Sequence, residues 1–280
     1  ELGARVFLKP ENLQKVGAFK ARGACNAVMA MDEAAARRGV ITHSSGNHGA
    51  ALAWAARARG VACVVVMPDS APKVKIAAVR GYGAEVVLCK AAEREATSAR
   101  LVQERDMTMV HPFEHPHVIA GQGTAALELM TDVPDLDVVI VPVGGGGLCA
   151  GTAVVARALR PEAWMLGAEP KAVDDAARSL ATGVRQPRVE NPKTWADCLL
   201  TALGEPNFAL MQKHRVRIVT VEEAAMVDGA RWFLERMKLV VEPGSASVLA
   251  AIRALGADVR GKRIGMVLSG GNTDFAWLAR

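Results

Sequence analysis

The chain has few aromatic residues and no long apolar run. Aromatic side chains make up 4% of its 280 residues although 51% are hydrophobic, so we expect a core of mainly Ala, Val and Leu. No apolar run approaches the roughly 20 residues that cross a bilayer as a helix. The basic residues are scattered and are not interleaved with aromatic ones. We therefore expect neither a membrane nor a nucleic acid as a partner.

Paired cysteines are also missing. The cysteines are odd in number, lie far apart and form no Cys-x-x-Cys pair, and they are Cys25, Cys63, Cys89, Cys149 and Cys198. This usage is typical of reduced thiols and predicts a cytoplasmic protein.

Several catalytic motifs do not occur. The chain has no H-E-x-x-H, no G-x-S-x-G, no EF-hand loop and no G-x-x-x-x-G-K-[ST], which removes support for zinc proteases, hydrolases with a serine elbow and P-loop enzymes. His111, His115 and His117 with Glu114 resemble a metal cluster. Two prolines, Pro112 and Pro116, interrupt the run, so we do not expect a metal there.

Short β-rich runs alternate with Ala-rich helical patterns along the whole chain. The strands are expected at 5–8, 40–43, 62–67, 85–88, 138–143, 165–168, 217–221 and 263–268. The helices are expected at 24–37, 47–59, 73–82, 93–105, 124–130, 148–159, 222–237 and 245–255. This alternation predicts an α/β fold with mostly parallel sheets covered by helices on both faces.

Two domains are expected. The block 40–110 holds three strand–helix units and is predicted to be a small domain inserted into a large one made of 1–39 and 111–280. Residues 171–203 are rich in Pro and Arg and predict a long irregular excursion. The chain opens directly on a strand, so we expect an N-terminal portion to precede it.

One lysine lies in a tight setting near the start of the chain. The segment 16–23, Val-Gly-Ala-Phe-Lys-Ala-Arg-Gly, places Lys20 between an aromatic residue and small ones at the head of an apolar helix. Burial disfavours the charged form of an amine. A neutral lysine amine condenses with aldehydes, so Lys20 is a candidate nucleophile.

Four consecutive glycines follow an apolar strand. Gly144, Gly145, Gly146 and Gly147 stand between the strand at 138–143 and a helix, where backbone amides and the helix dipole favour a phosphate. The same stretch fits G-x-G-x-x-A, and Glu169 ends the next strand. A nicotinamide-dependent dehydrogenase therefore stays open as an alternative at this point.

Two further strand ends carry polar residues. The run 44–49, Ser-Ser-Gly-Asn-His-Gly, opens a helix and offers side-chain and backbone donors suited to a carboxylate. Ser269 ends the last strand, where its hydroxyl could face a ring nitrogen.

Taken together, these motifs resemble the fold-type II pyridoxal-phosphate enzymes, whose architecture is that of the tryptophan synthase β-subunit. Within them the chain resembles the serine/threonine dehydratase and serine racemase family, over nearly its whole length. The resemblance is carried by 18–23, 44–49, 117–124, 144–147, 235–239 and 269–272.

The resemblance implies roles for the cofactor residues. Lys20 would bind pyridoxal 5′-phosphate as a Schiff base and later remove the substrate Cα proton. Phe19 and Asn47 would hold the ring, Asn47 at its 3′-oxygen, and Ser269 would face the pyridine nitrogen. The glycines 144–147 would bind the phosphate.

It also implies a substrate site. The substrate carboxylate would meet Ser44, Ser45, Asn47 and His48. Ser45 would face the second side of Cα, as racemisation requires.

The distal end of the substrate would meet Arg94 and Thr201. A divalent ion, Mg²⁺, Ca²⁺ or Mn²⁺, would bind Glu169, the Val173 carbonyl and Asp175. One departure from the family pattern is Cys198, which replaces a common glycine after Asp197.

The predicted function is the dehydration and deamination of L-serine, L-threonine or a related 3-hydroxy amino acid to a 2-oxo acid and ammonia. Serine racemisation in the same site is the nearest alternative, and a β-replacement synthase is the third. From other classes, a nicotinamide-dependent dehydrogenase and a catalytically silent ligand-binding relative stay open. The family resemblance implies a homodimer.

Overall fold

The computed structural model of this chain describes residues 2–44 and 46–279. The chain forms two compact units: one joins the chain up to Phe19 to the chain from Gln122 onward, and the other is Lys20–Gly121. The predicted small domain, 40–110, falls inside the second unit. That unit also holds the helices before residue 40, because the first of them packs against the helix that follows residue 46.

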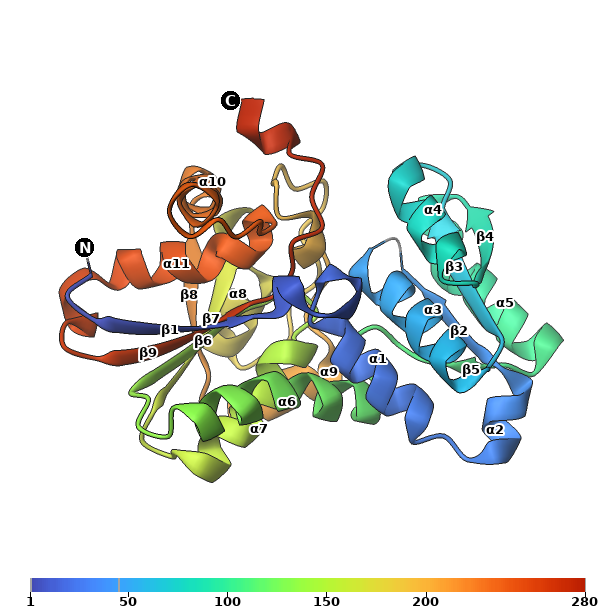
Figure 1. Cartoon of the computed structure of the whole chain (residues 1–280), viewed down its shortest axis with the longest axis horizontal. Helices are drawn as coiled ribbons and strands as arrows, with labels where there is room; N and C mark the ends of the chain where they lie inside the picture. Colours follow the sequence, from blue (N-terminus) through green and yellow to red (C-terminus); the bar gives the residue numbers. More distant parts are fainter. Residues whose placement is uncertain (1, 45, 280) are drawn as a thin grey trace. The chain divides into compact units, whose positions relative to one another are not determined.

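The first unit is built on a sheet of five parallel strands (Figure 1). In spatial order these are β1 (Arg5–Pro10), β9 (Arg263–Leu268), β6 (Val138–Pro142), β7 (Trp164–Pro170) and β8 (Arg217–Val221). The first and last strands of the chain are neighbours, with Arg5 opposite Arg263 and Pro10 opposite Leu268. All carboxyl ends therefore lie at one edge of the sheet.

Helices cover both faces of this sheet (Figure 1). The longer ones are α6 (Pro116–Asp132), which begins in the second unit, α7 (Gly147–Leu159), α8 (Asp175–Thr182), α9 (Glu205–Lys213), α10 (Glu223–Trp232) and α11 (Pro243–Leu255). Short 3₁₀ turns are Glu11–Leu13, Lys15–Gly17, Lys171–Val173, Asp197–Leu199, Gly256–Val259 and Ala276–Ala279, and Phe233–Met237 is a π-helix.

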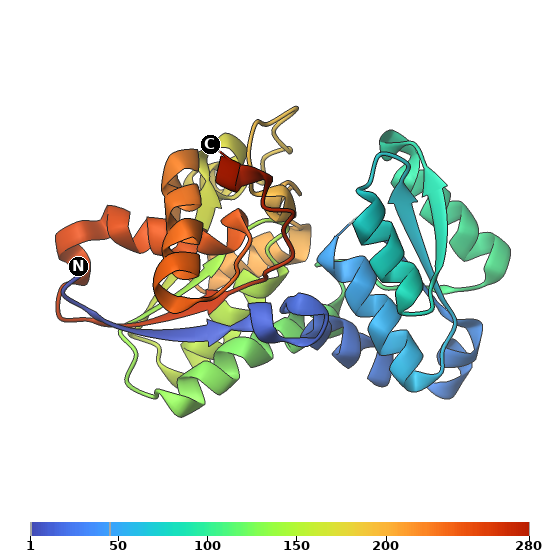
Figure 2. The same ribbon diagram turned by 45° about the horizontal axis from the view of Figure 1, so that its top comes forward.

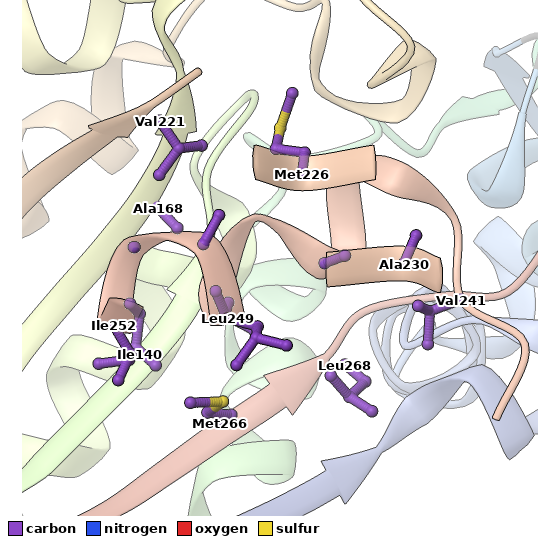
Figure 3. Packing of buried hydrophobic residues seen from close by; sticks show 14 of the residues in the cluster. Ile140, Ala168, Val221, Met226, Ala230, Val241, Leu249, Ile252, Met266 and Leu268 are labelled. Atoms are coloured by element: carbon purple, nitrogen blue, oxygen red, sulfur yellow. The ribbon is translucent and has the colours of Figure 1, made fainter. Parts of the chain in front are cut away.

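The main core lies between α10, α11 and the sheet (Figure 3). Ile140, Ala168 and Met266 come from three neighbouring strands, and Leu249 and Ile252 come from α11. Strands buried on both faces read as continuous apolar runs, which explains why the sequence marks them clearly.

The second unit is a sheet of four parallel strands with its own helices (Figure 2). In order, the strands are β4 (Glu85–Cys89), β3 (Cys63–Pro68), β2 (Val40–His43) and β5 (Thr108–Met109). The helices are α1 (Lys20–Met29), α2 (Glu33–Arg38), α3 (Asn47–Arg59), α4 (Lys73–Gly81) and α5 (Arg94–Arg105), with a 3₁₀ turn at Ala91–Glu93. Helices α3 and α4 cover one face and α5 the other (Figure 2).

The predicted α/β class with parallel sheets covered by helices is confirmed. Several details of the sequence prediction are wrong. Strand β5 and helix α9 were not predicted, and α6 begins at Pro116 instead of at residue 124. The helix expected at 24–37 is two helices, because the Asp32 side chain accepts a hydrogen bond from the Ala35 amide (2.7 Å) and starts α2. The irregular excursion at 171–203 contains α8.

Within the described residues, none of the helices combines the length and the apolarity that a membrane crossing requires.

Candidate active site

The tetraglycine loop connects β6 to α7 in the first unit. Gly146 has φ +87°, and a Cβ there would lie 2.5 Å from Leu203 Cδ1 and 2.9 Å from Asn207 Cβ. The Gly145 carbonyl accepts hydrogen bonds from the Asn207 side chain (2.6 Å) and the Gly204 amide (3.1 Å). Within the part of the chain that the structure describes, no side chain caps the start of α7. The uncapped amides and the missing Cβ atoms fit a phosphate group.

The turn after β9 is fastened to the segment before Lys20. The Phe19 amide donates to the Ser269 carbonyl (2.9 Å), and the Gly271 amide donates to the Gly17 carbonyl (3.0 Å). Ala18 forms an antiparallel bridge with Gly270. Two predicted cofactor residues, Phe19 and Ser269, are thus brought together within the first unit, and Ser269 is buried.

Lys20 is the first residue of α1 and begins the second unit. Its half-buried Nζ donates to the Pro112 carbonyl at 2.8 Å. This contact turns the amine toward the loop that follows β5, inside its own unit. The main-chain bond between Phe19 and Lys20 therefore joins a predicted ring contact of one unit to the predicted nucleophile of the other.

The 44–49 segment connects β2 to α3. Gly46 is the N-cap of α3, and none of the described side chains caps the helix. The Gly46 amide makes a long contact of 3.4 Å with Ser44 Oγ. Asn47 is the first residue of α3. Ser45, predicted to be catalytic, lies outside the described residues. The start of α3 fits the carboxylate predicted there.

His48 is buried under this loop, with 2% of its surface exposed. Its Nε2 lies 3.1 Å from the Val110 carbonyl and must donate to it, so Nδ1 is the unprotonated nitrogen. Burial, and next the charge of Lys20, lower the pKa of His48 well below its ordinary value. His48 is therefore a neutral imidazole near the lysine.

Two further histidines lie in the same region of the second unit, and the sequence did not single them out together. His43 ends β2 and meets the His111 ring edge to face, with 5.3 Å between ring centres. The Glu114 amide donates to His111 Nδ1 at 3.1 Å. Burial lowers the pKa of His111 to about 4 and also lowers that of His43. In the sequence, the only indication that these two histidines lie together was their position at or just after strand ends.

Arg94 is the first residue of α5, in the second unit. Its Nε is buried and has no hydrogen-bond partner among the described residues. The Arg94 charge contributes to lowering the pKa of His43, so the guanidinium lies within electrostatic range of that ring. Thr201, its predicted companion at the distal end, is exposed in the first unit.

The three predicted metal ligands lie in the first unit. Glu169, in β7, accepts hydrogen bonds from the amides of Ala176 (2.9 Å) and Ala177 (2.8 Å) at the start of α8. The Asp175 carboxylate accepts a hydrogen bond from the Leu203 amide (2.8 Å). Val173, which lies between Glu169 and Asp175 in the sequence, is buried.

Burial raises the pKa of Glu169 to about 8, and the charge of Asp175 adds to this shift. Burial also raises the pKa of Asp175. Two buried carboxylates whose charged forms are disfavoured by burial are a donor set that fits a hard divalent cation.

The loop of His111, Glu114, His115 and His117 does not form a metal cluster in the described structure. The one group of three Asp, Glu, His or Cys side chains whose ligand atoms all lie within 4.8 Å, among residues 2–44 and 46–279, is Asp197, Cys198 and Glu242.

The loops, the lysine and the parallel sheets define a fold-type II pyridoxal-phosphate enzyme. Residues 1–270 match the family described as "Pyridoxal-phosphate dependent enzyme", and the chain belongs to that family. The family match confirms the predicted cofactor, pyridoxal phosphate, and the predicted enzyme class.

Individual relatives narrow the resemblance. A serine racemase of Dictyostelium discoideum is 44% identical over 285 residues, which cover 99% of this chain and 87% of the relative. An L-threo-3-hydroxyaspartate ammonia-lyase of Pseudomonas sp is 44% identical over 277 residues, covering 98% and 86%. The crystal structure of a threonine deaminase of T.th. matches with a TM-score of 0.92 and 44% identity, covering 98% of this chain and 90% of that one.

Proposed function

We propose that this chain is a pyridoxal-phosphate-dependent ammonia-lyase that acts on an L-3-hydroxy amino acid. The substrate loses its Cα hydrogen and β-hydroxyl as water, and the resulting imino acid takes up water and releases ammonia. The net products are one 2-oxo acid and one ammonia. The observation that carries this proposal is Lys20, a half-buried amine among neutral histidines in a chain of this family.

The cofactor would be held mainly by backbone in the first unit. The amides of 144–147 and the start of α7 would bind its phosphate. Phe19 and Asn47 would hold the ring, and Ser269 would face the ring nitrogen. When bound, the cofactor supplies an electron sink for the bonds at Cα. A serine hydroxyl brings no negative charge to the ring nitrogen, which favours prompt loss of the β-hydroxyl.

Lys20 would accept the Cα proton at Nζ. The amides and side chains of 44–49 would bind the substrate carboxylate at the start of α3, where the helix dipole is positive. The imidazoles of buried His48 and of half-buried His43 and His111 stay neutral at pH 7 because burial lowers their pKa. They therefore add no positive charge beside Lys20 and do not compete with the start of α3 for the substrate carboxylate.

Arg94 favours a substrate with a second carboxylate. A buried Nε without a partner among the described residues costs free energy unless an acceptor arrives, and a guanidinium binds carboxylates through two parallel hydrogen bonds. Serine and threonine offer no such group, whereas 3-hydroxyaspartate does. We therefore propose 3-hydroxyaspartate as the preferred substrate, in line with the named activity of the Pseudomonas relative.

A substrate panel tests this function. L-serine, L-threonine and L-threo-3-hydroxyaspartate are assayed for 2-oxo acid and ammonia, with the wild type and Lys20→Ala. We expect release from at least one substrate, fastest from hydroxyaspartate, and an absorbance band near the visible edge that Lys20→Ala abolishes. A wild type with the band but no release from any of the three would overturn the proposed lyase activity.

Racemisation is the second candidate, because a named serine racemase is among the most similar relatives. Ser45 would protonate the face of Cα opposite Lys20. Chiral chromatography of the same reactions detects the D-isomer. Ser45→Ala is expected to abolish racemisation and to leave elimination from the L-isomer largely intact. Equal loss of both would remove the two-face role of Ser45.

We also propose a structural divalent cation, Mg²⁺, Ca²⁺ or Mn²⁺, at Glu169, the Val173 carbonyl and Asp175. Oxygen ligands suit these hard ions, and an ion would compensate the two buried carboxylates. The cytoplasmic location and the homodimer stay predictions.

A further inference from the structure

Asp197, Cys198 and Glu242 form a compact group of three ligand side chains in the first unit. The Cys198 sulfur and one carboxylate oxygen from each acid all lie within 4.8 Å of one another. Asp197 and Cys198 belong to the 3₁₀ turn Asp197–Leu199, whereas Glu242 is the N-cap residue of α11. The group thus joins two elements that are distant in sequence.

The position of the Cys198 sulfur depends on Gly244. A Cβ at Gly244 would lie 2.5 Å from Cys198 Sγ. Glu242 is two residues earlier and is 3% exposed, so the thiol is packed against the backbone that presents the buried carboxylate. The glycine leaves room for the sulfur, and the three ligands are pre-arranged by packing.

The group lies close to the predicted cofactor segments of the same unit. The Glu242 amide donates to the Gly270 carbonyl (3.0 Å), next to Ser269. Val241 and Leu268, the residues before Glu242 and Ser269, lie near one another in Figure 3. On the other side, a Cβ at Gly144 would lie 3.5 Å from the Cys198 carbonyl oxygen. An ion at this group would therefore lie beside both segments.

We propose that Asp197, Cys198 and Glu242 bind a thiophilic divalent cation such as Zn²⁺. One thiolate with two carboxylates is a set of ligand types that zinc accepts, and three protein ligands leave a fourth position open. The sulfur selects against Mg²⁺ and Ca²⁺, which prefer oxygen. This site differs in its residues and in its chemistry from the all-oxygen site at Glu169 and Asp175. It does not depend on the proposed lyase activity.

Cadmium is the probe for this site, because its bond to a thiolate gives an ultraviolet charge-transfer band. The holoenzyme is titrated with Cd²⁺ in excess Mg²⁺, which saturates any hard-cation site. The wild type is expected to develop the band at one equivalent and to bind Zn²⁺ in competition. Cys198→Ser is expected to abolish the band and to weaken Zn²⁺ binding, measured by calorimetry, by at least about tenfold.

Further variants separate the site from general effects. Asp197 is exposed, so Asp197→Asn tests one ligand without disturbing the core. Gly244→Ala tests whether the space beside Gly244 is needed to position the Cys198 sulfur. Both are expected to weaken Zn²⁺ binding, whereas Cys89→Ser, a half-buried thiol of the second unit, is expected to leave it unchanged. A band that persists in Cys198→Ser, or a wild type that binds neither ion, would overturn the proposal.

Discussion

The two units carry different kinds of groups among the residues that the sequence predicts to be functional. In the first unit these are mostly backbone: a tetraglycine loop, the start of α7 and the turn after Ser269. In the second unit they are the start of α3 and a set of titratable side chains, namely Lys20, Arg94 and three histidines. The difference indicates that one unit would recognise the cofactor by shape and the other would supply charge and proton transfer. Substitutions in the first unit should therefore weaken cofactor binding, whereas substitutions in the second should change substrate specificity and pH dependence.

The largest effect, on cofactor affinity, is expected from a substitution in the tetraglycine loop of the first unit. Gly146→Ala places a Cβ against Leu203 and Asn207, at a backbone φ of +87° that side chains disfavour. The loop must then shift, and its amides no longer point at the phosphate. We expect cofactor affinity to fall by at least about 100-fold, since several hydrogen bonds to a charged group are lost together. Absorbance titration with pyridoxal phosphate measures this.

Gly183→Ala is the matched control. Gly183 also has a positive φ, +73°, but the nearest atom to its Cβ position is 3.7 Å away and it lies at the end of α8. This variant should carry a similar backbone strain and keep the cofactor. If both variants bind the cofactor equally well, the loop does not hold the phosphate by shape.

The next effect is expected from charge in the second unit. Arg94→Met keeps an unbranched, largely apolar stem and removes the guanidinium. The kcat/KM for L-threo-3-hydroxyaspartate is expected to fall about 10- to 100-fold, the value of a hydrogen-bonded charge pair, with little change for L-serine. Arg100→Met is the control on the same helix, because Arg100 is exposed and pairs with Glu104 at 2.7 Å. A parallel loss on both substrates would contradict a role in specificity.

Lowering the pH should destabilise the second unit more than the first, because the half-buried and buried histidines His111 and His48 lie in the second unit. The pKa of His111 is lowered to about 4 and that of His48 well below 6.5, both chiefly by burial, so the unfolded chain binds these protons first as pH falls. For His111, the stability contributed by the neutral ring is full above about pH 6.5 and is lost toward pH 4, whereas for His48 it is lost as the pH falls below 6.5. Each ring adds a slope of about 1.4 kcal/mol per pH unit in that window.

Urea unfolding at pH 7 and pH 5 measures this slope. The groups that face His111 are Glu114, His43, Lys20 and Glu95, and the two acids oppose the shift. His111→Gln is expected to flatten the pH dependence by one histidine, with the exposed His117→Gln as control. An unchanged slope in His111→Gln would show that this ring is not kept neutral by folding.

The smallest effect is expected from the proposed cation. Saturating Mg²⁺ should raise the melting temperature by a few degrees, which is about what 100-fold saturation provides in a chain of this length. Glu169→Gln should remove the response, whereas Glu162→Gln, an exposed acid paired with Arg160, should keep it. If neither chelation nor Mg²⁺ moves the wild-type transition, the two buried acids have a purely structural role.

Much of the fold could be predicted from the sequence, because the buried parallel strands are continuous apolar runs. The strand predicted at 138–143 is observed as Val138–Pro142, and that at 263–268 is observed unchanged. Helix α8 was missed because part of what caps it, the Glu169 carboxylate, comes from another element. Local pattern cannot reveal a cap of that kind.

The candidate site motifs are local, and the structure places both 144–147 and 44–49 between a strand and a helix as predicted. Their roles in binding stay predictions. The neighbourhood of His43 and His111, the seat of Cys198 over Gly244 and the buried Nε of Arg94 depend on packing between distant segments. No spacing in the sequence encodes them.

The pairing of β1 with β9 has a consequence for biosynthesis. Strand β1 must wait for β9, its partner in the sheet, which is made only after Lys20–Gly121 and most of the first unit. Lys20–Gly121, by contrast, holds all the partners of its own sheet and can close while translation continues. The nascent chain is therefore expected to fold the second unit before the first. A chaperone that covers Arg5–Pro10 would act during that interval.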